Sequence, residues 1–478
     1  MRSKLQQIGL VLVGLVAGVT LSLNFSAIAQ KNAAHPLPVE ELRNFTDVFN
    51  AIKQGYVEPV EDKKLISHAI SGMLANLDPH SSYLDADAFK DLQVSTQGEF
   101  GGLGIEVGME DGLVKVVSPI EDTPAFRAGV KTGDLIFKLD DTPVKGMTLN
   151  DAVKKMRGKP KTSIKLTILR KGETKPLELT IMRDVIKVQS VKSKLLEPGY
   201  GFLRVTQFQE ETAADVVKHL DKLYKADVEA KGTGLKGLVL DLRNDPGGLL
   251  HGAIGVSAAF LPANSVVVTT DGRVEDAKRK YTAASEDYLR GGREDFIKKL
   301  PEGARTVPMI VLVNGGSASA SEIVAGALQD HKRAVVMGTQ TFGKGSVQTV
   351  LPLSSKAAIK LTTARYYTPN GRSIQAKGIE PDIVVEETPN GGSRDRLREA
   401  DLGRHLAADK DTKESKEAPK PAAPKAPEKA PGKNGKDGGK EGKDDDEAHT
   451  KPFEPASKDD YQLSQAMNLL KALNVIKK

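Results

Sequence analysis

Three short segments of the sequence combine residue types that could do chemistry with glycines that let the backbone approach closely. The first, Leu240–Gly248, reads Leu-Asp-Leu-Arg-Asn-Asp-Pro-Gly-Gly. The second, Asn314–Glu322, reads Asn-Gly-Gly-Ser-Ala-Ser-Ala-Ser-Glu, and the third, Gly343–Gln348, reads Gly-Lys-Gly-Ser-Val-Gln. Each lies at the end of an expected strand, and ligands usually bind at strand ends in α/β sheets. The three segments together therefore predict one functional site.

A serine nucleophile in the second segment would be Ser319, and such a serine needs a base. His251 follows the first segment and His331 follows the expected helix, so a Ser-His-Asp triad is one arrangement. Lys344 is the other base, provided that burial lowers its pKa well below its usual value of about 10.4. The glycines on both sides of Lys344 would let its amine be buried. The residues by themselves leave both bases open.

Simpler interpretations account for parts of this pattern. Ser319 and Glu322 have the spacing of a capping box, which by itself would explain both residues. The stretch Gly338–Lys344 matches the first part of a phosphate-binding G-x-x-x-x-G-K loop. However, Gly345 stands where that loop requires Ser or Thr, and a strand pattern follows where a helix should begin. We therefore expect no nucleotide site.

Composition excludes several other classes of site. The 478 residues include no cysteine, which rules out disulfides, thiolate zinc sites and a cysteine nucleophile. The 69 Lys and Arg residues nearly balance 63 Asp and Glu residues, and the net charge of +6 gives no nucleic-acid footprint. Nothing in the sequence implies a metal or another cofactor.

The N-terminus has the order of a secretory signal peptide, which we place at residues 1–29. Arg2 and Lys4 precede an apolar run over Ile8–Leu23, and Ala27-Ile28-Ala29 follows as a small-x-small cleavage site. The apolar run contains glycines and falls short of the roughly 20 residues that a membrane span needs. We expect cleavage rather than anchoring, and both outcomes place the body of the chain outside the cytoplasm.

The spacing of apolar residues divides the rest of the chain into segments of different character. A helical region is followed by short alternating strands, then by a regular alternation of strand and helix, which argues for an α/β core. A Lys/Pro/Ala/Glu-rich tract that cannot fold precedes a final amphipathic helix. We expect a mixed α/β, multidomain fold with these boundaries: 36–95 helical arm, 99–185 strand-rich domain, 186–388 core with a surface excursion at 271–306, 389–456 disordered tract, and 457–478 C-terminal helix.

The residues from Val39 to Glu386 resemble the C-terminal processing peptidases, also called tail-specific proteases. The resemblance rests on Gly-x-Gly-Ile near Gly102, Leu-Asp-Leu-Arg-x-x-x-Gly-Gly, Ser-Ala-Ser-Ala-Ser-Glu and Phe-Gly-Lys-Gly-x-Val-Gln, in the family's order. It implies a serine endopeptidase whose core is similar to the crotonase and Clp protease folds. The residue roles implied by the resemblance are nucleophile Ser319, general base Lys344, lysine-orienting Gln348, and oxyanion-hole amides at Gly248 and Ala320.

Residues 99–185 resemble a PDZ domain, most specifically in Ala-Gly-Val-Lys-x-Gly-Asp-Leu-Ile, which begins at Ala128. The resemblance implies that this domain captures the apolar C-terminal tails of protein substrates. The expected substrate-binding residues are Gly102, Leu103, Gly104 and Ile105 in the carboxylate loop and first strand, with Val153 and Met156 lining an apolar pocket. Val153 and Met156 could equally be domain core.

The N-terminal signal pattern implies a periplasmic enzyme, which would be held at the inner membrane if the signal peptide is retained. The terminal helices could join copies of the chain into a homo-oligomer, and an adaptor protein could be needed for activity. Two alternative functions stay open at this point. One is a non-catalytic PDZ scaffold, and the other is a Ser-His-Asp hydrolase that uses His251.

Overall fold

A computed structural model describes most of the chain, which divides into two compact units, Met1–Gly72 and Met73–Lys478. The described residues are 38–120, 122–353, 356–389, 397–408, 456–457 and 459–476. The expected signal peptide and most of the expected disordered tract lie outside them, although residues 397–408 of that tract are described and contain the short helix η3 (Glu399–Asp401). Within those ranges, no helix has the length and apolar character that crossing a bilayer requires.

The helical region consists of α2 (Val39–Gly55), α3 (Asp62–Ala75) and α4 (Ala86–Gln97), as the apolar spacing predicts. Glu40 and Glu41 lie in the first turn of α2, where the helix dipole favours negative charge. No residue of α2 is buried, and apolar side chains such as Leu42 and Phe45 are about half exposed.

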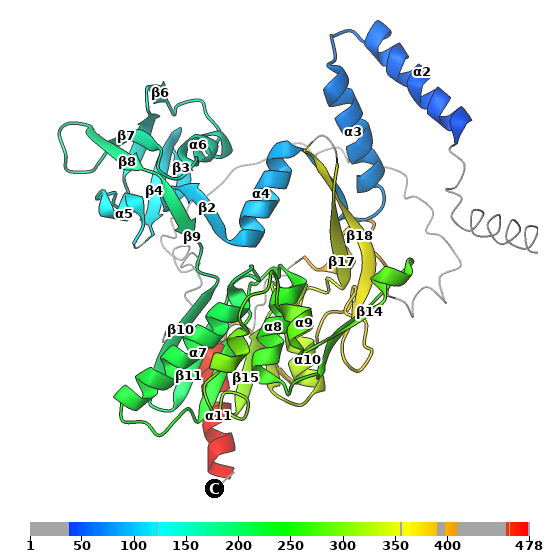
Figure 1. Ribbon diagram of the computed structural model, residues 1–478. Helices are drawn as coiled ribbons and strands as arrows, with labels where there is room; N and C mark the ends of the chain where they lie inside the picture. Colours follow the sequence, from blue (N-terminus) through cyan, green and yellow to red (C-terminus); the bar gives the residue numbers. More distant parts are fainter. Residues whose placement is uncertain are drawn as a thin grey trace, which may run out of the picture. The chain divides into compact units, whose positions relative to one another are not determined.

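The strand-rich domain has its own sheet and its own hydrophobic core (Figure 1). The sheet order is β3 (Ile105–Glu110), β4 (Leu113–Pro119), β5 (Leu135–Leu139), β7 (Ser163–Leu169) and β8 (Leu177–Met182), with β6 (Thr142–Pro143) beside β5. Two helices, α5 (Pro124–Arg127) and α6 (Leu149–Met156), accompany it, and β2 (Glu99–Gly102) pairs with β9 (Asp184–Lys187). Strand β3 lies at the end of the sheet order, so one of its edges is unpaired within the described sheet.

The core is built on a six-stranded sheet. Its order is β10 (Val191–Glu197), β11 (Tyr200–Val205), β12 (Gly237–Asp241), β15 (Met309–Val313), β16 (Val335–Gly338) and β19 (Ile383–Val384). From β11 onward all neighbours are parallel. Every residue of β12 and β15 is buried, which matches the apolar sequence of β15, the apolar sequence of β12 up to its final Asp241, and the covering of both sheet faces.

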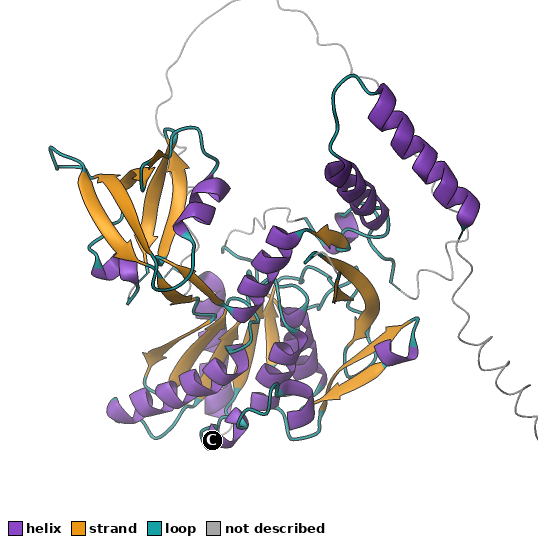
Figure 2. Cartoon of the chain, turned by 45° about the horizontal axis from the view of Figure 1, so that its top comes forward, coloured by secondary structure: helices purple, strands orange, loops and turns teal. Residues whose placement is uncertain are grey.

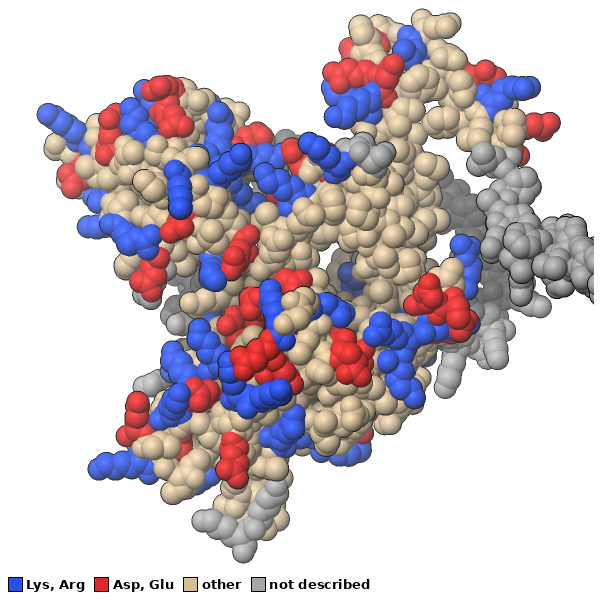
Figure 3. All heavy atoms as spheres, in the orientation of Figure 1, with Lys and Arg blue, Asp and Glu red and all other residues tan. Residues whose placement is uncertain are grey.

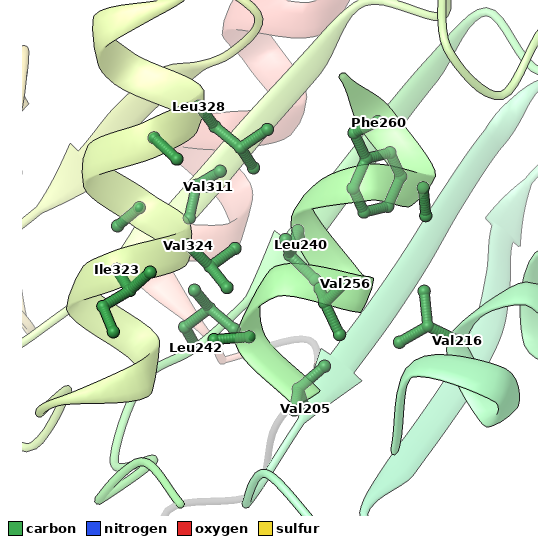
Figure 4. Close-up of a cluster of buried hydrophobic side chains, with 14 of the residues drawn as sticks. Val205, Val216, Leu240, Leu242, Val256, Phe260, Val311, Ile323, Val324 and Leu328 are labelled. Carbon is green, nitrogen blue, oxygen red and sulfur yellow. The ribbon is translucent and has the colours of Figure 1, made fainter. Parts of the chain in front are cut away.

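Helices cover one face of this sheet, and α7 (Thr212–Glu229), α8 (Leu250–Phe260) and α10 (Ala320–Asp330) form that layer. Successive strand residues point to opposite faces, so Leu240 and Val311 pack against the helices while their chain neighbours face the other way. Figure 4 shows Leu240 and Val311 among side chains of α8 and α10. The α/β expectation for the core is therefore confirmed.

The opposite face is covered by the C-terminal helix α11 (Tyr461–Ile476). Leu463, Ala466 and Leu470 are buried against strand residues of that face. Just before the helix, Asp460 accepts a hydrogen bond of 2.7 Å from Arg243 Nη2, and the Arg243 side chain is 1% exposed. This buried ion pair joins the segment just before α11 to the segment that leads into the Pro-Gly-Gly turn.

A second sheet joins β1 (Ser82–Leu84), β18 (Ala358–Tyr367), β13 (Val266–Gly272) and β14 (Arg279–Thr282), with β17 (Ser346–Pro352) also beside β18 (Figure 2). The stretch 271–306 was expected to be a surface excursion, and the structure differs. It contributes β14 and the short helix α9 (Ser285–Tyr288), and Ala283, Tyr288 and Ala304 are buried in the main core. These few apolar residues anchor a segment whose overall polarity suggested an exposed loop.

The described surface carries both signs of charge. On the face shown in Figure 3, Lys and Arg side chains are interspersed with Asp and Glu side chains. This mixture agrees with the near balance of acidic and basic residues in the sequence.

Candidate active site

The fold brings the three sequence segments together because β12, β15 and β16 are adjacent parallel strands. Each segment follows the carboxyl end of one of these strands. Backbone hydrogen bonds then join the loops: Ala318 N–H donates to Asp245 O at 2.9 Å, and Phe342 N–H donates to Ser317 O at 3.0 Å. The prediction that these strand ends meet is confirmed.

Ser319 sits immediately before α10 in a strained backbone conformation. Its φ and ψ angles are 54° and −112°, values that a residue with a Cβ rarely adopts. Such strain costs about 1–3 kcal/mol and persists only where the surroundings enforce it, typically at functional sites. The side chain is nearly buried, with 8% of the residue exposed.

The Pro-Gly-Gly turn lies directly against Ser319. A Cβ added to Gly247 would lie 2.8 Å from Ser319 Cβ and 2.9 Å from Ala320 N, and one added to Gly248 would lie 2.0 Å from Phe208 O. Both glycines have positive φ angles, 96° and 146°. Only glycine fits these two positions, so the close approach of the turn to the serine depends on their missing side chains.

Two backbone amides at this point have no acceptor. Within the described parts of the chain, neither Gly248 N–H nor Ala320 N–H donates a hydrogen bond. Ala320 is the first residue of α10, where unpaired amides and the helix dipole favour negative charge. Free N–H groups beside a serine are the arrangement that stabilises an oxyanion.

Glu322 joins the serine loop to the lysine loop. The residue is fully buried. Its Oε2 accepts from Ser319 N at 2.8 Å and Lys344 N at 2.9 Å, and its Oε1 accepts from Gly343 N at 2.7 Å and Thr341 Oγ1 at 2.5 Å. The sequence showed Glu322 as a capping residue, and the structure adds that the same carboxylate fixes the backbone on which Lys344 is mounted.

Lys344 has an environment that suits a base. Burial lowers the pKa of its amine, and the nearby positive charge of Lys360 lowers it further, whereas Glu399, Glu322 and Asp78 act in the opposite direction. A lowered pKa increases the neutral fraction that can accept a proton. The Lys344 amine and the Ser319 hydroxyl, both described, are not hydrogen bonded to each other; such contacts often form only when substrate binds.

Gln348, which the resemblance assigns to orienting the lysine, lies on β17 close to this loop. Its amide donates to Ser346 Oγ at 2.9 Å and to Thr362 Oγ1 at 3.3 Å. Thr362 Oγ1 in turn donates to Asp78 Oδ1 at 3.0 Å. Gln348 is thus part of a polar network that includes one of the carboxylates near Lys344.

The histidines have other partners. His251 Nε2 lies 3.2 Å from Glu210 Oε2, and burial lowers its pKa. His80 Nε2 lies 2.7 Å from Glu399 Oε2. His331 Nε2 is 2.7 Å from Val266 O. None of these contacts involves Ser319.

Glu399 is a site residue that sequence reasoning missed. It is fully buried, and its Oε1 accepts from Gln375 Nε2 at 2.9 Å. Gln375 Oε1 accepts from Gly345 N at 3.0 Å, so the segment around residue 399 supports the lysine loop. No signal in the local sequence links positions so far apart. Among the described residues, no cluster of three His, Asp or Glu side chains could hold a metal ion.

In the strand-rich domain, the expected tail-binding residues divide into two groups. Leu103 and Met156 are buried in the domain core, with 2% and 6% exposure. Ile105 and Val153 are half-buried, and Val153 lines a cavity of about 510 Å³ together with Phe100 and Arg157. Gly102, the last residue of β2, and Gly104, just before β3, are both buried and flank Leu103.

Comparisons with known proteins agree with this arrangement. Residues 199–385 match the model of peptidase family S41, residues 101–181 match the PDZ domain, and residues 17–88 match the N-terminal domain of the activating protease CtpB. The chain is 50% identical over 376 residues to a carboxy-terminal-processing protease of Bartonella bacilliformis, covering 78% of this chain and 82% of that one.

Two further similarities concern proteins of the same description. The carboxy-terminal processing protease CtpA of Bacillus subtilis is 34% identical over 391 residues, or 81% of this chain and 78% of that protein. A solved photosystem II D1 C-terminal processing protease is 30% identical, with a TM-score of 0.40 over 71% of this chain and 92% of that chain. The two domain matches and the 50% identity to the Bartonella bacilliformis protein show that the chain belongs to peptidase family S41, as a carboxy-terminal processing protease with a PDZ domain.

Proposed function

We propose that this protein is an exported serine endopeptidase in which Ser319 and Lys344 form the catalytic dyad. The observation that carries the proposal is the strained Ser319, which the Pro-Gly-Gly turn approaches at Gly247, together with the amides of Gly248 and Ala320, which donate no hydrogen bond within the described residues. A hydrolase of this type needs a nucleophile whose developing oxyanion meets preorganised donors. The neighbouring lysine with a lowered pKa supplies the base.

The reaction would proceed in two stages. Neutral Lys344 takes the proton from the Ser319 hydroxyl as its oxygen attacks the peptide carbonyl carbon, and the carbonyl oxygen becomes an anion held by the amides of Gly248 and Ala320. The lysine then gives its proton to the leaving amine, which leaves an acyl group on Ser319. Water hydrolyses this ester by the same steps, with Lys344 again taking and returning the proton.

The role of Gln348 follows from its network. Its amide lies on a hydrogen-bond path through Thr362 to Asp78, and Asp78 is one of the carboxylates that favour the charged form of Lys344. We propose that Gln348 positions the lysine side chain through this network when substrate is bound.

The PDZ domain would select substrates by their C-terminal tails. The N–H groups of Leu103 and Gly104 donate to no acceptor within the described residues, as a carboxylate-binding loop requires. Strand β3 has an unpaired edge on which a tail could add as a further strand. The half-buried Ile105 and Val153 offer apolar contact for the last side chains of the tail.

Location and assembly complete the proposal. The N-terminal sequence supports export to the periplasm, with inner-membrane attachment if the signal peptide is retained. The half-exposed apolar residues of α2 would suit pairing with a second copy, and an adaptor protein could be needed to activate the enzyme.

Cleavage of an unfolded reporter with an apolar C-terminal tail tests the proposal. The parent protein is compared with Ser319→Ala, Lys344→Ala and His251→Ala, and with a reporter whose tail is charged. We expect both dyad variants to be inactive, His251→Ala to remain active, and the charged tail to raise KM. Cleavage by Ser319→Ala at the parent rate would refute the nucleophile, and loss in His251→Ala alone would favour a Ser-His-Asp enzyme. Reporter binding without cleavage under all conditions would favour a PDZ scaffold.

A further inference from the structure

A second buried carboxyl group lies beside the reacting atoms, and the dyad mechanism does not use it. Asp245 stands in the Pro-Gly-Gly turn and is fully buried, with 0% exposure. Its Oδ1 accepts from Gly247 N at 2.8 Å. Its backbone oxygen accepts from Ala318 N and from Ser321 Oγ, both at 2.9 Å. Asp245 therefore touches both the oxyanion turn and the start of α10.

The other carboxyl oxygen has no partner. Asp245 Oδ2 is buried and, among the described residues, makes no hydrogen bond. An ionised carboxylate with one unsolvated oxygen is costly, whereas a protonated carboxyl group in the same place carries no net charge. An ionised Asp245 could be hydrated only if its side chain turned toward water. That movement would break the hydrogen bond that Gly247 N–H donates to Asp245 Oδ1.

The charged groups around Asp245 do not cancel this cost. Arg204 on β11 attracts the ionised form, but its guanidinium is already bonded to Asp241 on β12, with Nη1 to Oδ2 at 2.6 Å. The negative charge of Asp241 itself disfavours ionisation. Burial, the largest effect, raises the pKa of Asp245 to about 8, although the hydrogen bond from Gly247 N–H, the nearby Ser321 hydroxyl and the charge of Arg204 all act to lower it.

We propose that Asp245 is a positioning residue for the oxyanion hole: its protonated carboxyl group holds Gly247 and Gly248 in the catalytic geometry, and its ionisation at alkaline pH displaces the turn and slows cleavage. The inference rests on the proposed dyad mechanism. As pH rises, deprotonation of Lys344 increases the cleavage rate, whereas ionisation of Asp245 decreases it. The pH profile of kcat is therefore bell-shaped, with Asp245 responsible for its alkaline limb.

The test compares kcat at pH 7 and pH 9 in the parent and in Asp245→Asn, because an asparagine side chain has the shape of the protonated acid at every pH. We expect the parent kcat to fall about tenfold over this interval, with KM little changed, since ionisation of a group with a pKa of about 8 is then nearly complete. In Asp245→Asn the same ratio should be near one or above it. An equal fall in both proteins, or no fall in the parent, overturns the proposal.

A matched control is Asp227→Asn at the end of α7. Asp227 is equally buried, and it accepts backbone bonds from Gly199 N at 2.6 Å and Gly234 N at 2.9 Å in a different loop. The alkaline fall should persist in this variant. Its disappearance there would mean that loss of any buried carboxylate removes the limb, which contradicts a role specific to Asp245.

A measurement that needs no cleavage separates this inference from the proposed function. In a Ser319→Ala background, folded Asp245 keeps its proton up to about pH 8 while the unfolded chain loses it near pH 4, so the group lowers the stability of the fold as pH rises between these values. Tm should fall less from pH 6 to pH 8 when Asp245→Asn is added, and identical slopes would refute the inference. If Asp245→Asn does not fold, infrared spectra of the parent protein with carbon-13-labelled aspartate provide a second test. We expect a protonated carboxyl band that disappears near pH 8. Absence of this band at pH 7 also refutes the inference.

Discussion

Two buried carboxyl groups lie near Ser319, Asp245 in the Pro-Gly-Gly turn and Glu322 in the first turn of α10, and their hydrogen bonding differs. On the lysine side, the Glu322 carboxylate accepts four hydrogen bonds. On the oxyanion side, the Asp245 carboxyl group accepts one from Gly247 and has a buried oxygen without a partner. Similar burial therefore raises the pKa of Glu322 only to about 7 but that of Asp245 to about 8, despite the lower starting value of aspartate. The four donors to Glu322 oppose the rise in its pKa that burial causes.

This difference assigns distinct tasks to the two sides of the site. Glu322 holds the serine and lysine backbones together through the four hydrogen bonds that it accepts. Asp245 acts as a neutral acid that supports a turn in which only glycine fits at two positions. We expect changes at Glu322 to cost both stability and rate, and changes at the turn to cost mainly rate.

The largest effect is expected for Glu322→Gln. The glutamine NH2 group would face donors that now bond to one oxygen of Glu322, so about two of the four hydrogen bonds would be lost. Each hydrogen bond to a charged group contributes about 1.5–3 kcal/mol. Unfolding in urea should show a free energy lower by roughly 4 kcal/mol, with kcat reduced even where the variant is folded. Thr341→Val, which removes one donor, serves as the graded control. An unchanged free energy of unfolding in Glu322→Gln would contradict the anchoring role.

A smaller effect, confined to rate, is expected for Gly248→Ala. The new Cβ would lie 2.0 Å from Phe208 O, so the turn must shift and its amide would leave the oxyanion position. Loss of one such donor costs about 3 kcal/mol, or roughly 100-fold in kcat. Steady-state kinetics should show this fall with little change in KM. Gly252→Ala in α8 is the control, because its Cβ would meet its nearest atom, Gln209 O, at an acceptable 3.4 Å. Equal kcat values for the two variants would remove Gly248 from the oxyanion hole.

The smallest effect is expected for Lys360→Gln. Burial is the main cause of the lowered pKa of Lys344, and the charge of Lys360 is the second. Removal of that charge should raise the pKa of Lys344, so the acid limb of the kcat/KM profile should move to higher pH. The alkaline limb assigned to Asp245 should stay in place. The control is Lys298→Gln, which removes the charge of an exposed lysine. If the acid limb moves equally in both variants, the charge of Lys360 does not specifically lower the pKa of Lys344.

Sequence reasoning anticipated the parts of the molecule that local pattern determines. The α/β core, the helical region and the convergence of three strand ends follow from apolar spacing and from segment order. It also found the Ser319–Glu322 spacing, but only as a helix cap. The reach of Glu322 to Thr341 and Gly343 depends on the pairing of β15 with β16, which no local pattern contains.

Other features depend on the environment of single side chains. The proton on Asp245 follows from an oxygen without a donor, and no sequence motif signals an absent partner. The segment 271–306 looked like an excursion because it is polar on average, although a few buried residues such as Tyr288 join it to the core. In both cases tertiary contacts override what composition suggests.

Covalent labelling of Ser319 tests the central claim most directly. The protein is treated with a serine-reactive fluorophosphonate, and the labelled peptide is identified by mass spectrometry in the parent, in Lys344→Ala and in His251→Ala. The dyad mechanism predicts that the label is on Ser319 in the parent and in His251→Ala, and that labelling is lost in Lys344→Ala. A label on another serine, or undiminished labelling of Ser319 without Lys344, would contradict it.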